Sequence, residues 1–304
     1  LEHVVHVGVD TDTNTNVDYM FKSMKKSLLG MLLVVEKTGN ATLSGVRLED
    51  GGTHKPSLVS IRIGRKVVPM VRCNGLCNIQ KSVLIPRMGH GIEAFSGHFE
   101  DNVLWQSFVG LRMGGTATLL HNAIYGSVAD PNGESDGGDL ADSDSGIAAL
   151  DSGWGMTMIG NVVSGAEGPC IGFAAGFSMI HTRFANNSAH ACELGFAVKG
   201  SVKSRPDLGY GVIQDLVLWR IRNIGVWGYS KSNAPVMSNV RIADASVGFF
   251  WGGVGGNSEQ HVVYMQTIYI QNSLFLGRSN NNALCASQVS IGRGSYHACT
   301  HTPR

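Results

Sequence analysis

This sequence has little charge and no apolar run long enough to cross a membrane. Charged residues make up 15% of the 304 residues, and Lys+Arg (24) and Asp+Glu (23) nearly cancel to a net charge of +1. Such a composition provides no clustered basic face for a nucleic acid. The apolar run Leu28–Val35 follows the basic segment Lys22–Lys26, as in a signal peptide, but it is internal and shorter than the roughly 20 residues that span a bilayer. We expect a buried strand there, and membrane contact only through other parts of a longer parent chain.

Signals for helices are also missing. No window carries a capped apolar stripe with the helical period, and the connections are rich in glycine, of which the chain has 40. Instead, short runs such as Ala41–Leu48 and Leu58–Ile63 alternate apolar and polar residues and are bounded by turn residues. These runs predict an all-β fold. A β-sandwich, in which strands also follow one another closely, is the alternative to a solenoid.

One stretch nearly repeats itself and favours the solenoid. The pairs Gly172-Phe173 and Gly195-Phe196 lie 23 residues apart, and each follows a short strand-like run. From Gly195 to Gly225 is 30 residues and from Gly225 to Gly248 is again 23, which indicates one insertion that we place at 202–207. A repeat of this length is typical of one turn of a solenoid.

We therefore predict a right-handed parallel β-helix over residues 41–276, with about ten turns of roughly 22–25 residues. Residues 1–40 are expected to form an irregular N-terminal segment or the remnant of a preceding domain. Residues 130–151 read as an acidic loop insertion, and residues 277–304 as a C-terminal cap or linker.

The aromatic residues divide into two groups. Those at the Gly-aromatic step are expected to stack in register in the core, because each turn needs a large apolar side chain to fill its interior. They are Phe173, Phe196, Trp227 and Phe249. Three others fall outside this register and are candidates for an exposed glycan-binding surface: Trp219, Tyr229 and Trp251.

Six cysteines and two sequons indicate a secreted or cell-surface protein. Cys170 and Cys192 precede successive Gly-Phe steps, so stacked turns would bring them within disulfide range. The natural remaining pairs are Cys73 with Cys77 and Cys285 with Cys299, and the spacings fit no zinc site. Asn40 and Asn186 each begin an N-glycosylation sequon.

An acidic segment without any basic residue suggests calcium as the one candidate cofactor. No Lys or Arg occurs between Arg112 and Arg183, and carboxylates with glycine turns suit Ca²⁺. The candidate ligands are Asp136, Asp139, Asp142 and Asp144. A solvated loop is the alternative. A second acidic run, at 10–18, has Thr15 where a calcium loop needs glycine.

No residue is assigned a catalytic role. His190, with Glu167 or Glu193 as its partner, has the residue types of an acid–base pair. The alternative is that polar residues at the turns form hydrogen-bonded ladders that satisfy buried backbone groups. We expect the ladder.

The same stretch resembles a known family. Gly160–Glu167 ahead of Gly172-Phe173, and Phe184–His190 ahead of Gly195-Phe196, resemble the β-helix region of fibrocystin-like proteins and of the related cell-surface hyaluronidases. The resemblance implies a large, glycosylated extracellular or membrane-tethered protein in which the β-helix is one segment. It implies no particular activity, because only the hyaluronidase branch is catalytic.

These observations lead to an expected function. We expect an extracellular scaffold segment that acts as a rigid spacer or assembles into a coat or filament, with other surface proteins, further copies of itself or glycans as partners. Two alternatives stay open: a carbohydrate-active enzyme that depolymerises a polysaccharide such as hyaluronan, and a glycan-binding module.

Overall fold

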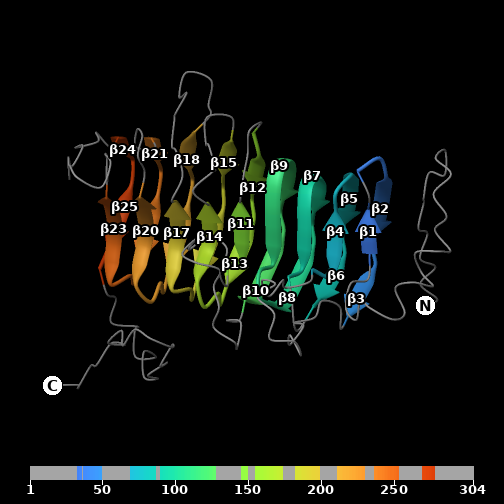
Figure 1. The fold of residues 1–304 in the computed structure, drawn as a ribbon. Coiled ribbons are helices and arrows are strands. Elements are labelled where there is room, and N and C mark those ends of the chain that lie inside the picture. The colour runs from blue at the N-terminus through green and yellow to red at the C-terminus, as the bar shows by residue number, and fades with distance from the viewer. Residues whose placement is uncertain are drawn as a thin grey trace, which may run out of the picture.

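Every element in the described part of the chain is a β-strand. The computed structural model describes residues 33–35, 37–49, 69–86, 90–127, 145–149, 155–173, 182–198, 211–229, 236–252 and 269–277. Their strands form a 16-stranded sheet, called sheet A here, and a nine-stranded sheet, called sheet B (Figure 1). Every pairing in both sheets is parallel. This arrangement is an all-β solenoid and excludes the antiparallel sandwich.

Each turn has three strand segments, and in two of the turns the first two segments are parts of one long strand. Sheet A provides two sides of the turn. Its first side contains β1 (Leu33–Val35), β4 (Val71–Cys73), the start of β7 (Ile92–Glu100) and of β9 (Leu111–Leu120), β11 (Ile147–Ala149), β14 (Pro169–Phe173), β17 (Leu194–Val198), β20 (Ile224–Tyr229) and β23 (Val247–Gly252). Its second side contains β2 (Asn40–Ser44), β5 (Leu76–Gln80), the ends of β7 and β9, β12 (Thr157–Ile159), β15 (Arg183–Ala185), β18 (Val212–Gln214), β21 (Val236–Ser238) and β24 (Tyr269–Gln271).

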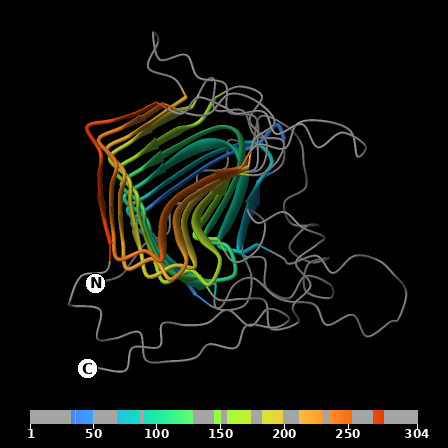
Figure 2. The same cartoon turned by 90° about the vertical axis from the view of Figure 1, so that its left-hand side faces the viewer.

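Sheet B provides the third side of each turn. It contains β3 (Arg47–Glu49), β6 (Val83–Ile85), β8 (Val103–Ser107), β10 (Ala123–Ser127), β13 (Val162–Ser164), β16 (Ser188–His190), β19 (Val217–Trp219), β22 (Arg241–Ala243) and β25 (Leu274–Leu276). The described strands thus make nine turns, which superpose as nested outlines in Figure 2. Strand pairing already begins at Leu33, before residue 41. In the described residues, no helix is long and apolar enough to cross a membrane.

Strand alternation explains the core. In most sheet B strands the second residue points inward, and the residues on either side of it point outward, as the pleat requires. The inward residues are apolar and almost fully buried, so each turn covers the apolar side chains of the next. In order, they are Leu84, Leu104, Ile124, Val163, Ala189, Leu218 and Ile242.

Three of the four aromatic residues predicted for the core, Phe173, Phe196 and Phe249, lie in or against it, but their register differs from the prediction. Phe173 and Phe196 are buried and in contact, with ring centroids 5.2 Å apart. However, Phe196 pairs with Ile171, so the two Gly-Phe steps are offset by two residues and the prediction that they stack in register is wrong. Trp227 also leaves the predicted column, because it pairs with Ala197 while Val226 aligns with Phe196 and Phe249.

The repeated glycine has a steric cause. Where the chain enters the first side of sheet A, glycines of successive turns lie directly over one another, and an added Cβ would come within 2.4–2.6 Å of the next glycine's carbonyl oxygen. Only glycine fits at these positions, because a Cβ atom would require backbone atoms of the next turn to move. The glycines with this contact are Gly91, Gly110, Gly195 and Gly225. The 30- and 23-residue spacings from Gly195 onward are therefore the true register.

We predict that Gly110→Ala lowers the free energy of unfolding by about 1–3 kcal/mol, the usual cost of overpacking. The new Cβ would lie 2.5 Å from Ile124 and 2.6 Å from the Gly146 carbonyl oxygen. Gly248→Ala is the matched control, because this last glycine of the column meets only the Phe275 ring, at 3.3 Å. Urea unfolding measures both variants. Equal losses would contradict the steric explanation.

An internal ladder of asparagines runs along one corner of the solenoid. Asn102, Asn122, Asn161 and Asn187 are buried and begin the turn into sheet B. Each of the first three side-chain amides donates to the amide oxygen of the next, at 3.0 Å. The same oxygens also accept backbone N–H groups of the preceding turn, at 3.0–3.2 Å. The predicted polar ladder is thus present, and it extends beyond the repeated stretch in which we expected it.

Two of the three predicted disulfides are confirmed. Cys73 is bonded to Cys77, and Cys170 to Cys192, with Cα–Cα distances of 6.1 and 5.6 Å. Disulfides are typical of proteins in oxidising compartments. Cys285 and Cys299 lie outside the described residues.

Removing the disulfide that closes the longer loop should lower the free energy of unfolding more than removing the other disulfide. We expect the Cys170→Ala/Cys192→Ala variant to lose about 3 kcal/mol of unfolding free energy, and Cys73→Ala/Cys77→Ala about 2 kcal/mol, because the sequence separations are 22 and 4 residues. All four cysteines are fully buried, so the two variants lose similar packing. Urea unfolding of both variants measures the difference. A larger loss at the short loop would contradict it.

Candidate functional site

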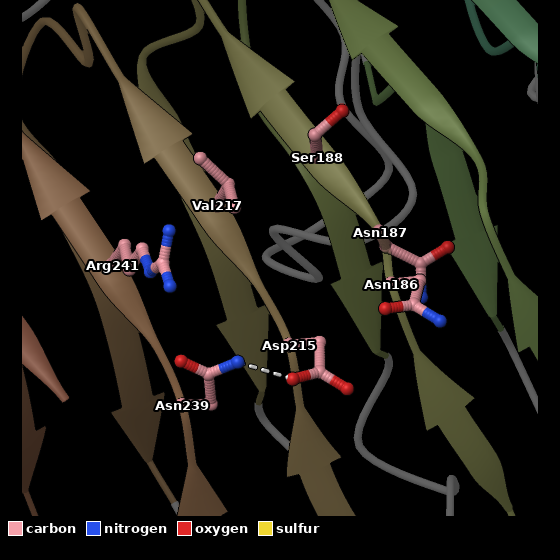
Figure 3. Close-up of a pocket in the computed structure, with 7 residues that line it drawn as sticks. All are labelled: Asn186, Asn187, Ser188, Asp215, Val217, Asn239 and Arg241. Atoms are coloured by element: carbon pink, nitrogen blue, oxygen red, sulfur yellow. Dashed lines mark hydrogen bonds between the residues drawn. The ribbon is translucent and has the colours of Figure 1, made fainter. Parts of the chain in front are cut away.

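The outer face of sheet B holds a hollow among the described residues. It has a volume of about 260 Å³ and lies where three successive turns pass from sheet A into sheet B. Figure 3 shows its lining side chains, with the Asn239 amide donating to the Asp215 carboxylate. The lining residues are Asn186, Asn187, Ser188, Asp215, Val217, Asn239 and Arg241.

The polar rim of the hollow follows from the shape of the corner. Each turn bends there through a residue with positive φ, a conformation that asparagine and aspartate adopt more easily than most residues. Asn186, Asp215 and Asn239 are three such residues, with φ of 54°, 52° and 55°. Successive turns stack these short polar side chains in one row beside the outward positions of sheet B.

A column of rings runs beside the hollow on the same face. The outward residue at the third position of successive sheet B strands is, in register, Trp105, Tyr125, Ser164, His190, Trp219 and Ala243. The Trp105 and Tyr125 ring centroids are 6.0 Å apart, and His190 and Trp219 stack at 4.2 Å with planes 16° apart. Trp105 stays 49% exposed. We call Trp105, Tyr125, His190 and Trp219 the ring column.

This face carries little charge. Between Val83 and Trp219, the outward side chains of the described sheet B strands are apolar, aromatic, hydroxyl or imidazole groups and the amide of Gln106. Burial, and then the nearby Arg220 guanidinium, lower the pKa of His190, which favours its neutral form. The formal charges of sheet B lie outside these positions: Asp215 and Arg241 line the hollow, and Arg47 and Glu49 form an ion pair on β3 at the opposite end of the sheet.

His190 does not form the acid–base pair considered from the sequence. Its ring stacks on Trp219, and its Nδ1 atom is buried without a hydrogen-bond partner. Glu193 instead accepts from Asn223 at 3.1 Å and lies 3.5 Å from the Arg222 guanidinium. His190 also lies outside the asparagine ladder, so it follows neither of the two roles weighed for it.

The other predicted site residues are scattered. Trp219 belongs to the ring column, whereas Trp251 packs against the core, with its ring over Gly228. Tyr229 ends β20, and its side chain is outside what the structure describes. Asn40 and Asn186, the two sequon residues, are exposed.

The proposed calcium ligands Asp136, Asp139, Asp142 and Asp144 lie outside the described residues. Within the described ranges, no group of three His, Cys, Asp or Glu side chains is placed to hold a metal ion.

Sequence reasoning missed the hollow and two of the four residues of the ring column, Trp105 and Tyr125. Trp105, Tyr125 and Asp215 are far apart in the sequence and resemble ordinary strand and turn residues. The available signal was their position: each ring stands two residues after the start of a sheet B strand. An alignment of the turns on Asn102, Asn122 and Asn187 would have placed Trp105, Tyr125 and His190 in one column.

The class of protein follows from the fold: this chain is an all-β solenoid of parallel strands with a polar hollow and a row of rings on one outer face. Comparisons with protein-family models, with curated proteins and with solved structures find no match.

Proposed function

We propose that the chain is a right-handed parallel β-helix that serves as a rigid spacer in a secreted or cell-surface glycoprotein of the fibrocystin-like kind. The observation that carries this proposal is the continuous core of nine turns, locked at one corner by the asparagine ladder. Such a core resists bending, because each turn is packed and hydrogen-bonded to both neighbours. Right-handedness is supported by the strong general preference of parallel strand connections for that hand.

The extracellular location is supported by two independent features. The two disulfides would be reduced in a cytosolic compartment. The sequon residues Asn40 and Asn186 are exposed, as an N-glycan requires. Other surface proteins or further copies of the chain are the partners that a spacer implies.

Secretion from animal cells and small-angle scattering together test the proposal. The secreted chain should carry two N-glycans, one lost in Thr42→Ala and one in Ser188→Ala, and its described core should scatter as a rod about 40 Å long. A chain that is retained with free thiols at Cys170 and Cys192, or a flexible scattering profile, would contradict it. Depolymerisation of hyaluronan by the secreted chain would instead support the enzyme alternative.

A further inference from the structure

We propose that the outer face of sheet B, from Trp105 to Arg241, is a binding site for an extended neutral polysaccharide. The proposal is independent of the spacer function, because it concerns a surface and not the core. The face crosses the six strands β8, β10, β13, β16, β19 and β22, which at ~4.8 Å per strand gives a track of about 24 Å. That length suits several sugar units lying along the solenoid axis.

The ring column supplies apolar contact surfaces. Sugar rings have flat C–H faces, and aromatic side chains provide large, rigid surfaces for such contacts at little entropic cost. Trp105 is 49% exposed and Val217 is 37% exposed, so the face is open at both of these strands. The rings of Tyr125, His190 and Trp219 are half-buried, and each contacts a neighbouring ring of the column.

Two small residues interrupt the rings at regular places. Ser164 lies between Tyr125 and His190, and Ala243 follows Trp219. Tyr125 and His190 are therefore two strands apart, about 9.6 Å along the axis. A ring lying over Ser164 would have an aromatic neighbour on each side and a hydroxyl beneath it.

The hollow supplies the polar groups that sugar hydroxyls need. The two outward positions of a strand are two residues apart, about 6.6 Å, so Ser188 and Val217 lie beside His190 and Trp219. Asp215 offers carboxylate oxygens and Arg241 offers guanidinium N–H groups at the same place. Ligand sites in proteins typically combine an apolar surface with a few such polar groups.

The charge distribution favours a neutral chain over an anionic one. A polyanion needs basic groups along its length, but among the described outward positions of β8, β10, β13, β16, β19 and β22 the only basic group is Arg241, at one end. At the hollow, the Asp215 carboxylate would also repel an acidic sugar. A neutral oligosaccharide avoids both costs.

Calorimetric titration of the secreted protein with cellohexaose, chitohexaose and a hyaluronan hexasaccharide tests the inference. The protein is used both as secreted and after enzymatic removal of N-glycans, because Asn186 lies at the rim of the hollow. At least one neutral hexasaccharide should bind saturably, with a change in tryptophan fluorescence. Trp105→Ala and Trp219→Ala should each weaken binding about fivefold or more.

Phe250→Ala is the matched control, because Phe250 is also 49% exposed but lies on β23, away from sheet B. It should leave the affinity within about twofold, and unchanged thermal unfolding would show that the Trp variants remain folded. Absence of neutral-sugar binding would overturn the inference. Preferential, salt-sensitive hyaluronan binding would overturn the neutral assignment. Self-association that disappears in the Trp variants, without sugar binding, would make the face a contact between copies of this chain.

Discussion

Lowering the pH from 6.5 to 4 should remove about 3 kcal/mol from the free energy of unfolding through His90 alone. The His90 side chain is only 8% exposed, and its Nδ1 atom has no hydrogen-bond partner. Burial, together with the positive charges of Arg112 and Arg72, lowers its pKa from 6.5 to about 3. The folded protein therefore keeps this imidazole neutral in mildly acidic solution.

The direction of the effect follows from proton binding. Below pH 6.5 the unfolded chain takes up a proton at His90, whereas the folded chain does not until the pH approaches 3. The contribution of neutral His90 to the free energy of unfolding is therefore fully present above pH 6.5, and it falls by about 1.4 kcal/mol per pH unit between 6.5 and 3. Below pH 3 both states carry the proton, and His90 contributes no further change.

The His90→Leu variant isolates this effect from the titration of carboxylates. Urea unfolding of wild type and variant between pH 7.5 and 4 should give a flatter pH dependence for the variant, by about 1.4 kcal/mol per unit below pH 6.5. His121→Gln is the control, because it removes an exposed histidine and leaves His90 in place. Parallel curves for wild type and His90→Leu would contradict the prediction.

The pKa of His90 depends on charged residues from neighbouring strands. Arg72 and Arg112 lie on the two turns that flank the turn of Glu93, and both reach this carboxylate, at 3.4 and 3.1 Å. The single carboxylate is shared, so little negative charge remains to stabilise an imidazolium. This alternation of Arg, Glu and Arg arises only when β4, β7 and β9 are placed side by side, and no local sequence pattern indicates it.

Parts of the fold that depend on local sequence patterns were predictable, whereas parts that depend on how the turns are aligned were not. Strand alternation, glycine turns and the cysteine spacing are local properties, so the all-β fold, the core role of Phe196 and two disulfides follow from them. Register is not local. Cys170-Ile171 takes the place that glycine and a following apolar residue have in other turns, and the nearby Gly172-Phe173 resembles that step closely enough to mislead.

The candidate site was harder to predict, because turn lengths vary. Tyr125 pairs with Ser164 across 39 residues that include the acidic insertion, whereas Trp105 and Tyr125 are separated by 20. A fixed repeat therefore cannot align the rings. The same uneven spacing separates the asparagines of the ladder, Asn102, Asn122, Asn161 and Asn187. These asparagines would therefore have been the better reference for aligning these turns.

Removing one asparagine from the middle of that ladder should be the most damaging single change to the described core. Asn161→Ala takes the acceptor from the backbone N–H and the side-chain amide of Asn122, both at 3.0 Å. It also takes the donor from the Leu119 carbonyl and from the Asn187 amide oxygen, both at 3.0 Å. Each buried polar group left without a partner costs about 1–3 kcal/mol, so the expected loss of unfolding free energy is about 3–5 kcal/mol.

Two further variants separate the hydrogen bonds from the volume of the side chain. Asn223→Ala removes one half-buried bond to Glu193 and should cost about 1 kcal/mol or less. Asn161→Asp keeps the shape of the side chain but places a buried carboxylate beside the Leu119 carbonyl. The variant should therefore lose more unfolding free energy, relative to wild type, at pH 7 than at pH 4, because at pH 4 the protonated acid can donate a hydrogen bond. Denaturant unfolding at both pH values measures all three variants. If Asn161→Ala costs no more than Asn223→Ala, or if the Asn161→Asp loss does not change with pH, the ladder does not stabilise the solenoid in this way, and the regular stacking of its turns rests on apolar packing alone.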